Sequence, residues 1–211
     1  MYSISIPQGF RVTAEQFEQL ANYEQEARLE LTALGELIIM SPTGGTAGRK
    51  NRRLTQQLGV WTDKDRTGES FDSSTVFILP NGARRSPDAS WVKLERWNQL
   101  TTKEQDGFPP IAPDFAIELV SPSDLRCDPA DFESARERAP REKNQRYQDL
   151  QNKMQEYLDN GVRLGWLIEP KSKTVEVYRQ GKSPEILNNP KRLSGENILP
   201  GFILDLTNIF T

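Results

Sequence analysis

The chain of 211 residues contains no histidine and a single cysteine, Cys127. Without histidine, serine–histidine–aspartate catalysis, imidazole general bases and histidine-based zinc sites are excluded. One cysteine cannot form an intramolecular disulfide, and with no histidine beside it a structural zinc site is not expected. The catalytic groups that remain are carboxylates, lysine, tyrosine, serine and metal ions bound through oxygen.

Long apolar runs are also missing. Runs such as residues 37–40 are too short for a transmembrane helix, and residues 1–7 lack the basic and apolar regions of a secretory signal. We therefore expect a cytoplasmic protein without a membrane partner, which the low cysteine content also fits. The net charge of −3 and the pI of about 5.3 differ from those of a DNA-coating protein, although a local basic surface would suffice for a nuclease.

The length suits one domain spanning residues 1–211, with a charged insertion at about 126–147. Thr13 and Gln16 form a capping-box pattern at the start of a helix, and Asn81-Gly82 predicts a tight turn between strands. Apolar periodicity predicts helices over residues 14–25, 47–62 and 140–160, a short helix or turn at 93–98, and strands at 28–32, 36–40, 76–79, 87–92, 115–120, 162–168, 175–177 and 202–206.

Residues 113–168 have the strand–helix–strand layout of a crossover unit, which makes its two strands parallel. The hairpins elsewhere predict antiparallel neighbours. We therefore expect an α/β or α+β fold with a mixed β-sheet flanked by helices.

Two acidic residues interrupt apolar or small-residue stretches. Glu118 lies in a strand with apolar residues on both faces, and Asp88 follows Pro87 in a predicted strand or at its edge. An ionised carboxylate in such a place needs a partner, and a hard cation such as Mg²⁺ would serve. The alternatives are a buried ion pair with an arginine for Glu118 and a turn-forming role for Asp88.

Glu30 and Lys153 are less distinctive. Glu30 alternates with Leu29 and Leu31, so the polar face of an edge strand accounts for it when it is taken alone. Lys153 lies on the border of the apolar face of its helix, about 60° from Leu150 on the helical wheel. Its side chain could extend into solvent or reach the Glu118 strand.

The order of these segments resembles the PD-(D/E)xK nuclease superfamily, and more closely a bacterial family of restriction-endonuclease-like proteins. The resemblance extends over most of the chain outside about 126–147. The segments that carry it are Arg28-Leu29-Glu30-Leu31, Gly35 to Pro42, Ser86 to Val92, Pro113 to Ser123, Lys153 to Tyr157, and Gly161 to Ile168.

The resemblance implies a metal-dependent endonuclease. Asp88 and Glu118 would bind Mg²⁺ or Mn²⁺ together with the carbonyl oxygen of Leu119, and Glu30 would be an accessory acid. The superfamily's lysine normally stands two residues after the second acid, where this chain has Val120. The resembling family supplies its lysine from the next helix, which corresponds to Lys153.

Lys143 is a second candidate for that lysine, but Lys153 fits the surrounding pattern better. The implied partner is nucleic acid, with DNA expected, and related nucleases pair as homodimers. The alternative is a nuclease fold without catalysis that binds nucleic acid or protein. A basic cluster formed by Arg49, Lys50, Arg52 and Arg53 could contact phosphates or could be a solvated helix face.

Overall fold

The computed structural model describes residues 10–24, 27–40, 42–121 and 145–211. Much of the expected charged insertion, residues 126–144, and the alternative Lys143 lie outside the described residues. Among the described helices, none is long and apolar enough to cross a membrane.

Six strands form the central sheet, in the order β10-β9-β8-β7-β6-β3. The crossover prediction is confirmed, because β7 and β8 are parallel while the other neighbours in this sheet are antiparallel. The strands are β3 (Gly68–Asp72), β6 (Ala89–Lys93), β7 (Phe115–Leu119), β8 (Leu164–Glu169), β9 (Thr174–Arg179) and β10 (Glu185–Asn188).

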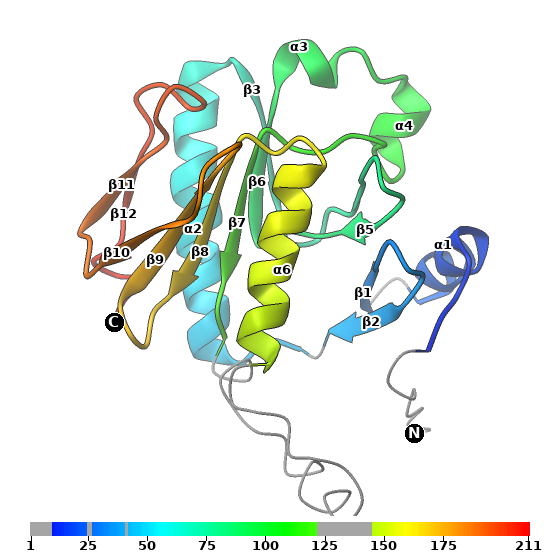
Figure 1. Cartoon of the computed structure of the whole chain (residues 1–211). Coiled ribbons are helices and arrows are strands. Elements are labelled where there is room, and N and C mark those ends of the chain that lie inside the picture. The colour runs from blue at the N-terminus through cyan, green and yellow to red at the C-terminus, as the bar shows by residue number, and fades with distance from the viewer. Residues whose placement is uncertain (1–9, 25–26, 41, 122–144) are drawn as a thin grey trace, which may run out of the picture.

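Two long helices lie on opposite faces of this sheet, α2 (Gly45–Asp65) and α6 (Gln145–Asp159) (Figure 1). Each helix packs its apolar stripe on the sheet. Leu54 and Leu58 of α2 join one core cluster, whereas Met154 and Tyr157 of α6 join the other. The expected mixed sheet flanked by helices is therefore confirmed.

Strand β7 is buried along its whole length, as its two apolar faces predict. Successive side chains point to opposite faces of a strand. Phe115 and Ile117 belong to the core under α2, whereas Ala116 and Val120 belong to the core under α6. Glu118 shares this second face, so its carboxylate is directed toward α6.

A second sheet has the order β2-β1-β5-β4, and helix α1 packs on it through the fully buried Phe17. The predicted capping box at Thr13 is present, and so is the predicted hairpin between β1 and β2. The elements of this part are α1 (Ala14–Tyr23), β1 (Arg28–Leu31), β2 (Leu37–Met40), β4 (Phe77–Ile78) and β5 (Arg84–Arg85).

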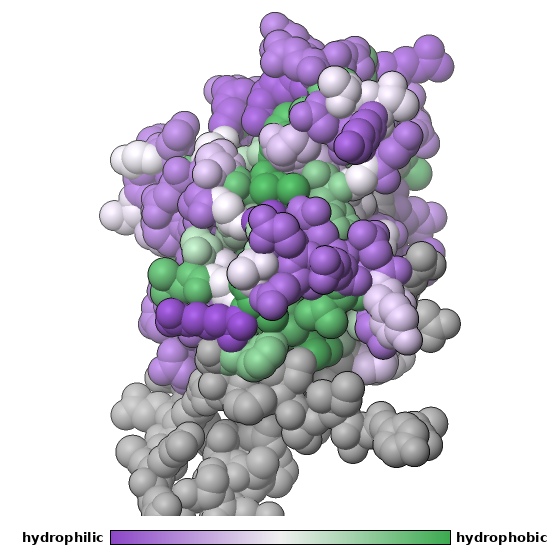
Figure 2. Space-filling model, turned by 90° about the vertical axis from the view of Figure 1, so that its right-hand side faces the viewer, coloured by the Kyte–Doolittle hydropathy of each residue, from purple (hydrophilic) through white to green (hydrophobic). Residues whose placement is uncertain are grey.

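The face of the molecule that carries α1 and the β1–β2 hairpin is mostly hydrophilic, with apolar residues gathered in places (Figure 2). The exposed large apolar residues of this part are Phe10, Leu20, Tyr23, Leu34, Ile38 and Ile39.

Two predictions about strands are corrected. Asp88 is not in a strand, because residues 86–88 connect β5 to β6 where the chain passes from one sheet to the other. Glu30 is not on an exposed edge either, because β1 lies between β2 and β5. Pairing between β1 and β5, which are distant in sequence, decides the outcome for Glu30.

The remaining elements are short. The predicted short helix at 93–98 is present as α3, whereas β3, α4, β10 and β11 were not predicted because their apolar patterns are weak. These smaller elements are α3 (Leu94–Trp97), α4 (Thr102–Asp106), β11 (Arg192–Ser194) and β12 (Ile203–Asp205).

Candidate active site

The four residues predicted from the sequence come from four different elements and meet between α6 and the two larger sheets. Glu30 is in β1, Asp88 is in the β5–β6 connection, Glu118 is in β7 and Lys153 is in α6. The Lys153 ammonium lies 2.8 Å from Glu30 Oε1 and 2.9 Å from Glu118 Oε1. Asp88 joins them through the neighbour of Glu118, because its Oδ2 accepts a hydrogen bond of 2.9 Å from the Leu119 N–H.

Lys153 is not a solvated lysine at the helix border. Its side chain is 11% exposed, and its ammonium contacts two carboxylates. Burial by itself would lower the pKa of Lys153, but the charges of Glu118 and Glu30 raise it above its ordinary value. The site therefore holds a charged ammonium beside Glu118.

Glu30 accepts hydrogen bonds from three groups. Besides Lys153, Arg85 Nη1 donates at 3.2 Å and the Ser86 N–H donates at 2.9 Å. Arg85 in turn donates from Nε to Glu156 Oε2 at 2.6 Å, so it is held between two acids. Burial would raise the pKa of Glu30, yet Lys153 and Arg85 lower it below its ordinary value. Glu30 is a buried, ionised carboxylate, and its donors direct it toward Lys153 and Arg85.

Glu118 is in a different electrostatic environment. Burial raises the pKa of Glu118 to about 7, although Lys153 opposes the shift, and the nearby charge of Asp88 adds to it. The Tyr157 hydroxyl donates to Glu118 Oε1 at 2.8 Å, so the same oxygen receives both Lys153 and Tyr157. The other carboxylate oxygen, Oε2, has none of these contacts.

Asp88 is half-buried and has one donor at each oxygen. The Leu119 N–H binds Oδ2, and Asn51 Nδ2 of α2 donates to Oδ1 at 3.1 Å. Burial raises the pKa of Asp88 despite the hydrogen bond from Leu119. A carboxylate oxygen can accept more than one hydrogen bond or metal contact, so acceptor capacity remains on Asp88.

These residues fit a divalent cation by their chemistry. Asp88 and Glu118 are close enough for their charges to repel, which a bound cation would offset, and carboxylate oxygens are the ligands that Mg²⁺ prefers. In the part of the chain that the structure describes, no three acidic or cysteine side chains cluster into a metal centre on their own. A cation here would therefore need oxygens beyond those of the acids.

The basic cluster on α2 is partly engaged within the chain. Arg49 and Arg53 donate to the carbonyl oxygens of Thr211 and Asn208, at 3.0 and 2.6 Å. Arg52 donates to Gln56, one helical turn further along. These contacts attach the start of α2 to the C-terminal segment, a role that the sequence pattern did not predict.

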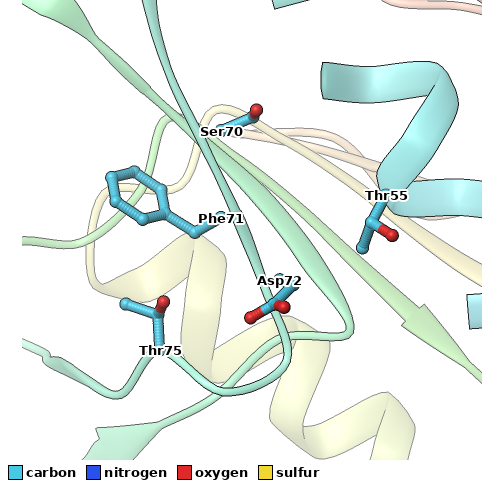
Figure 3. Close-up of a pocket in the computed structure, with 5 residues that line it drawn as sticks. All are labelled: Thr55, Ser70, Phe71, Asp72 and Thr75. Carbon is cyan, nitrogen blue, oxygen red and sulfur yellow. The ribbon is translucent and has the colours of Figure 1, made fainter. Parts of the chain in front are cut away.

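A pocket lies between Thr55 of α2 and residues of β3 and the segment after it (Figure 3). Thr55, which lines it, donates to the carbonyl oxygen of Asn51, and Asp72 is paired with Ala89, the residue after Asp88. The pocket thus lies near the Asp88–Asn51 pair. Its lining residues are Thr55, Ser70, Phe71, Asp72 and Thr75.

Sequence reasoning did not single out Asn51, Arg85 as a link between two acids, or Tyr157 as a donor to Glu118. Tyr157 belongs to the predicted apolar face of its helix, where a hydroxyl needs a buried partner. Asn51 precedes Leu54 by one helical turn, which was the one sign that it faces inward.

The fold is of the restriction-endonuclease-like class. The model of the family described as "Putative restriction endonuclease" matches residues 14–131 and 141–207, and the chain belongs to this family.

Among solved structures, the chain is similar to a putative nuclease from Anabaena variabilis ATCC 29413, with a TM-score of 0.64 and 19% sequence identity. The match covers 86% of this chain and 89% of that one, and it supports the fold. No curated protein matches the sequence.

Proposed function

We propose that this chain is a divalent-metal-dependent endonuclease that hydrolyses phosphodiester bonds of DNA. The observation that carries the proposal is the position of the Lys153 ammonium, 2.9 Å from Glu118 and near enough to Asp88 for its charge to oppose the rise in the pKa of that acid. An ammonium beside two acids that repel each other matches the needs of phosphoryl hydrolysis, in which negative charge develops on the phosphate.

The residues would divide the work as follows. Asp88, Glu118 and the carbonyl oxygen of Leu119 would hold Mg²⁺ or Mn²⁺. The bound ion would lower the pKa of a water molecule and neutralise charge on the phosphate. Lys153 would orient the attacking water or stabilise the charge on the phosphate oxygens. Glu30 would act as an accessory acid that keeps Lys153 charged and in place, because its carboxylate is already occupied by three donors.

The first test is a calorimetric titration of Mn²⁺ into the wild-type protein and into Asp88→Ala, followed by cleavage assays on plasmid DNA. We expect the wild type to bind Mn²⁺ in one event and to cleave the plasmid. We expect Asp88→Ala to do neither. An Asp88→Ala protein that bound Mn²⁺ and cleaved DNA as well as the wild type would refute the proposal.

The second candidate is a nuclease fold that binds nucleic acid or protein without cleaving. The net charge of −3 and the engagement of Arg49 and Arg53 by the C-terminal segment favour it, because they leave fewer cations for a DNA backbone. Failure of both proteins to bind Mn²⁺ would support this candidate over the enzyme.

We also propose that residues 1–211 form one domain and that two copies associate, by analogy with related nucleases that pair to reach both DNA strands. Light scattering on the purified protein measures the mass directly. A monomer at all concentrations used for cleavage would contradict the dimer.

A further inference from the structure

Asn51 is the amide side chain of α2 that faces the candidate site. Its Nδ2 donates to Asp88 Oδ1 at 3.1 Å, across 37 residues of sequence. An ionised carboxylate only accepts hydrogen bonds, so Nδ2 must face Asp88 and the amide cannot be reversed. Since both polar atoms share one carbon, Asn51 Oδ1 is also held within the neighbourhood of Asp88.

That oxygen is buried and makes no hydrogen bond with any described residue. A buried acceptor without a partner is energetically unfavourable, so its persistence calls for an explanation. Another amide of α2, Gln57, contacts the C-terminal part of the chain and has no unpaired polar atom. Gln57 uses both of its polar atoms, with Nε2 donating to the Asp205 carbonyl and Oε1 accepting from the Asp205 N–H.

The cation site proposed above has fewer protein oxygen donors than a hard divalent cation takes. It has two carboxylates and one backbone carbonyl, because the third acid of the site, Glu30, is occupied by Lys153, Arg85 and Ser86. Hard divalent cations take six or more oxygen ligands, from carboxylates, amide carbonyls and water. An amide oxygen that is buried, unpaired and fixed beside one of the two acids has the chemistry of a further ligand.

We propose that Asn51 Oδ1 is a protein oxygen donor to the divalent cation held by Asp88 and Glu118, either directly or through one bound water. The inference rests on the proposed function and deepens it. In this arrangement the two ends of the amide have different tasks. Nδ2 orients Asp88, and Oδ1 completes the oxygen set from the α2 side of the sheet.

A purely supporting role would use only Nδ2. The two roles are separable, because Asn51→Asp keeps an oxygen at each position but removes the donor to Asp88, whereas Asn51→Ala removes both. A supporting role makes Asn51→Asp at least as harmful as Asn51→Ala, since the new carboxylate would repel Asp88. A ligand role makes Asn51→Asp the better tolerated of the two.

The experiment is calorimetric titration of Mn²⁺ at about pH 8, where ordinary carboxylates are ionised. The proteins are the wild type, Asn51→Ala, Asn51→Asp, Asp88→Ala and the matched control Gln57→Ala, each checked for folding by circular dichroism. We expect Asn51→Ala to weaken Mn²⁺ binding by about 10- to 100-fold, the range found when groups around a metal are removed. Asn51→Asp should bind close to the wild-type affinity, and Gln57→Ala should bind as the wild type does.

Each outcome decides between the proposals. Wild-type affinity in Asn51→Ala, or weaker binding in Asn51→Asp than in Asn51→Ala, would overturn the role of Oδ1 and leave the metal-dependent function standing, provided that Asp88→Ala has lost the ion. Absence of Mn²⁺ binding in the wild type would overturn the proposed function and this inference with it.

Discussion

Lys153 donates a hydrogen bond of 2.8 Å to Glu30, although 123 residues separate the two in the sequence. Both side chains are nearly fully buried, at 11% and 3% exposure. A buried ion loses its hydration, and this costs free energy. Lys153 and Glu30 therefore each need the opposite charge of the other to remain ionised. This pair joins α6 to the second sheet and fixes the ammonium beside Glu118.

Lys153→Met should abolish most cleavage while leaving Mn²⁺ binding in place, because the side chain keeps its length but loses its charge. The expected loss in kcat is on the order of 10²- to 10³-fold, as for the removal of one group that stabilises transition-state charge. Plasmid cleavage and calorimetry on the same preparation measure the two effects. Gln155→Met, which alters an exposed residue of α6, is the control and should leave both unchanged. If Lys153→Met lost both Mn²⁺ binding and cleavage, a purely catalytic role for Lys153 would be wrong.

Glu30→Gln should reduce cleavage and stability but leave the affinity for Mn²⁺ within the error of measurement. Its carboxylate contacts Lys153, Arg85 and Ser86, and the proposed cation ligands do not include it. Breaking one partner of a buried ionic network costs about 3–5 kcal/mol, and less where the remaining charges keep other partners, as Arg85 does with Glu156. Urea unfolding and Mn²⁺ titration separate the two effects. A large fall in Mn²⁺ affinity would instead make Glu30 a metal ligand.

Stability of the metal-free protein should depend on pH through Glu118. Burial raises the pKa of Glu118 to about 7 in the folded chain, above its ordinary value of 4.5. Between these values the unfolded chain releases the proton and the folded chain retains it, so the contribution of Glu118 to stability is present at low pH and falls as the pH rises to about 7.

In the Glu118→Gln protein, position 118 cannot titrate, so the protein lacks this pH-dependent contribution to stability. The free energy of unfolding of the wild type, measured in EDTA, should therefore decline relative to that of Glu118→Gln between about pH 5 and about pH 7. Tyr157→Phe retains the acid and should follow the wild-type trend. Parallel curves for the wild type and Glu118→Gln would mean that the pKa of Glu118 is not raised.

Gly165 sets how closely α6 approaches β8. A Cβ built at this position would lie 2.5 Å from Cε of the buried Met154, the residue next to Lys153. Gly165→Ala should therefore destabilise the fold by about 1 kcal/mol, toward the low end for overpacking because a flexible thioether end can move. The displaced helix should also lower the cleavage rate.

The matched control is Gly59→Ala in α2, where the nearest atom to a new Cβ is 3.9 Å away. This change should stabilise the protein slightly, since alanine is favoured over glycine inside a helix by up to about 1 kcal/mol. Thermal unfolding should show a lower melting temperature for Gly165→Ala and a slightly higher one for Gly59→Ala. A stabilising Gly165→Ala would show that the helix has room to move there.

Local chemistry in the sequence determined much of the fold. The capping box at Thr13, the Asn81-Gly82 turn and the doubly apolar strand around Glu118 were each readable from adjacent residues, and the structure has them. The strand–helix–strand layout was enough to predict that β7 and β8 are parallel. Glu118 stood out because an acid in such a strand conflicts with its surroundings.

Only the tertiary structure decided the environment of the other site residues. Glu30 looked like the polar face of an edge strand until β5 paired beside β1, and Asn51 has no local signal that sets it against Asp88. Periodicity reports which side of an element is apolar, but it does not report which element covers that side. Strand order and the sites where sheets meet are fixed by contacts between distant segments, and these contacts placed the lysine of α6 between the acids of β1 and β7.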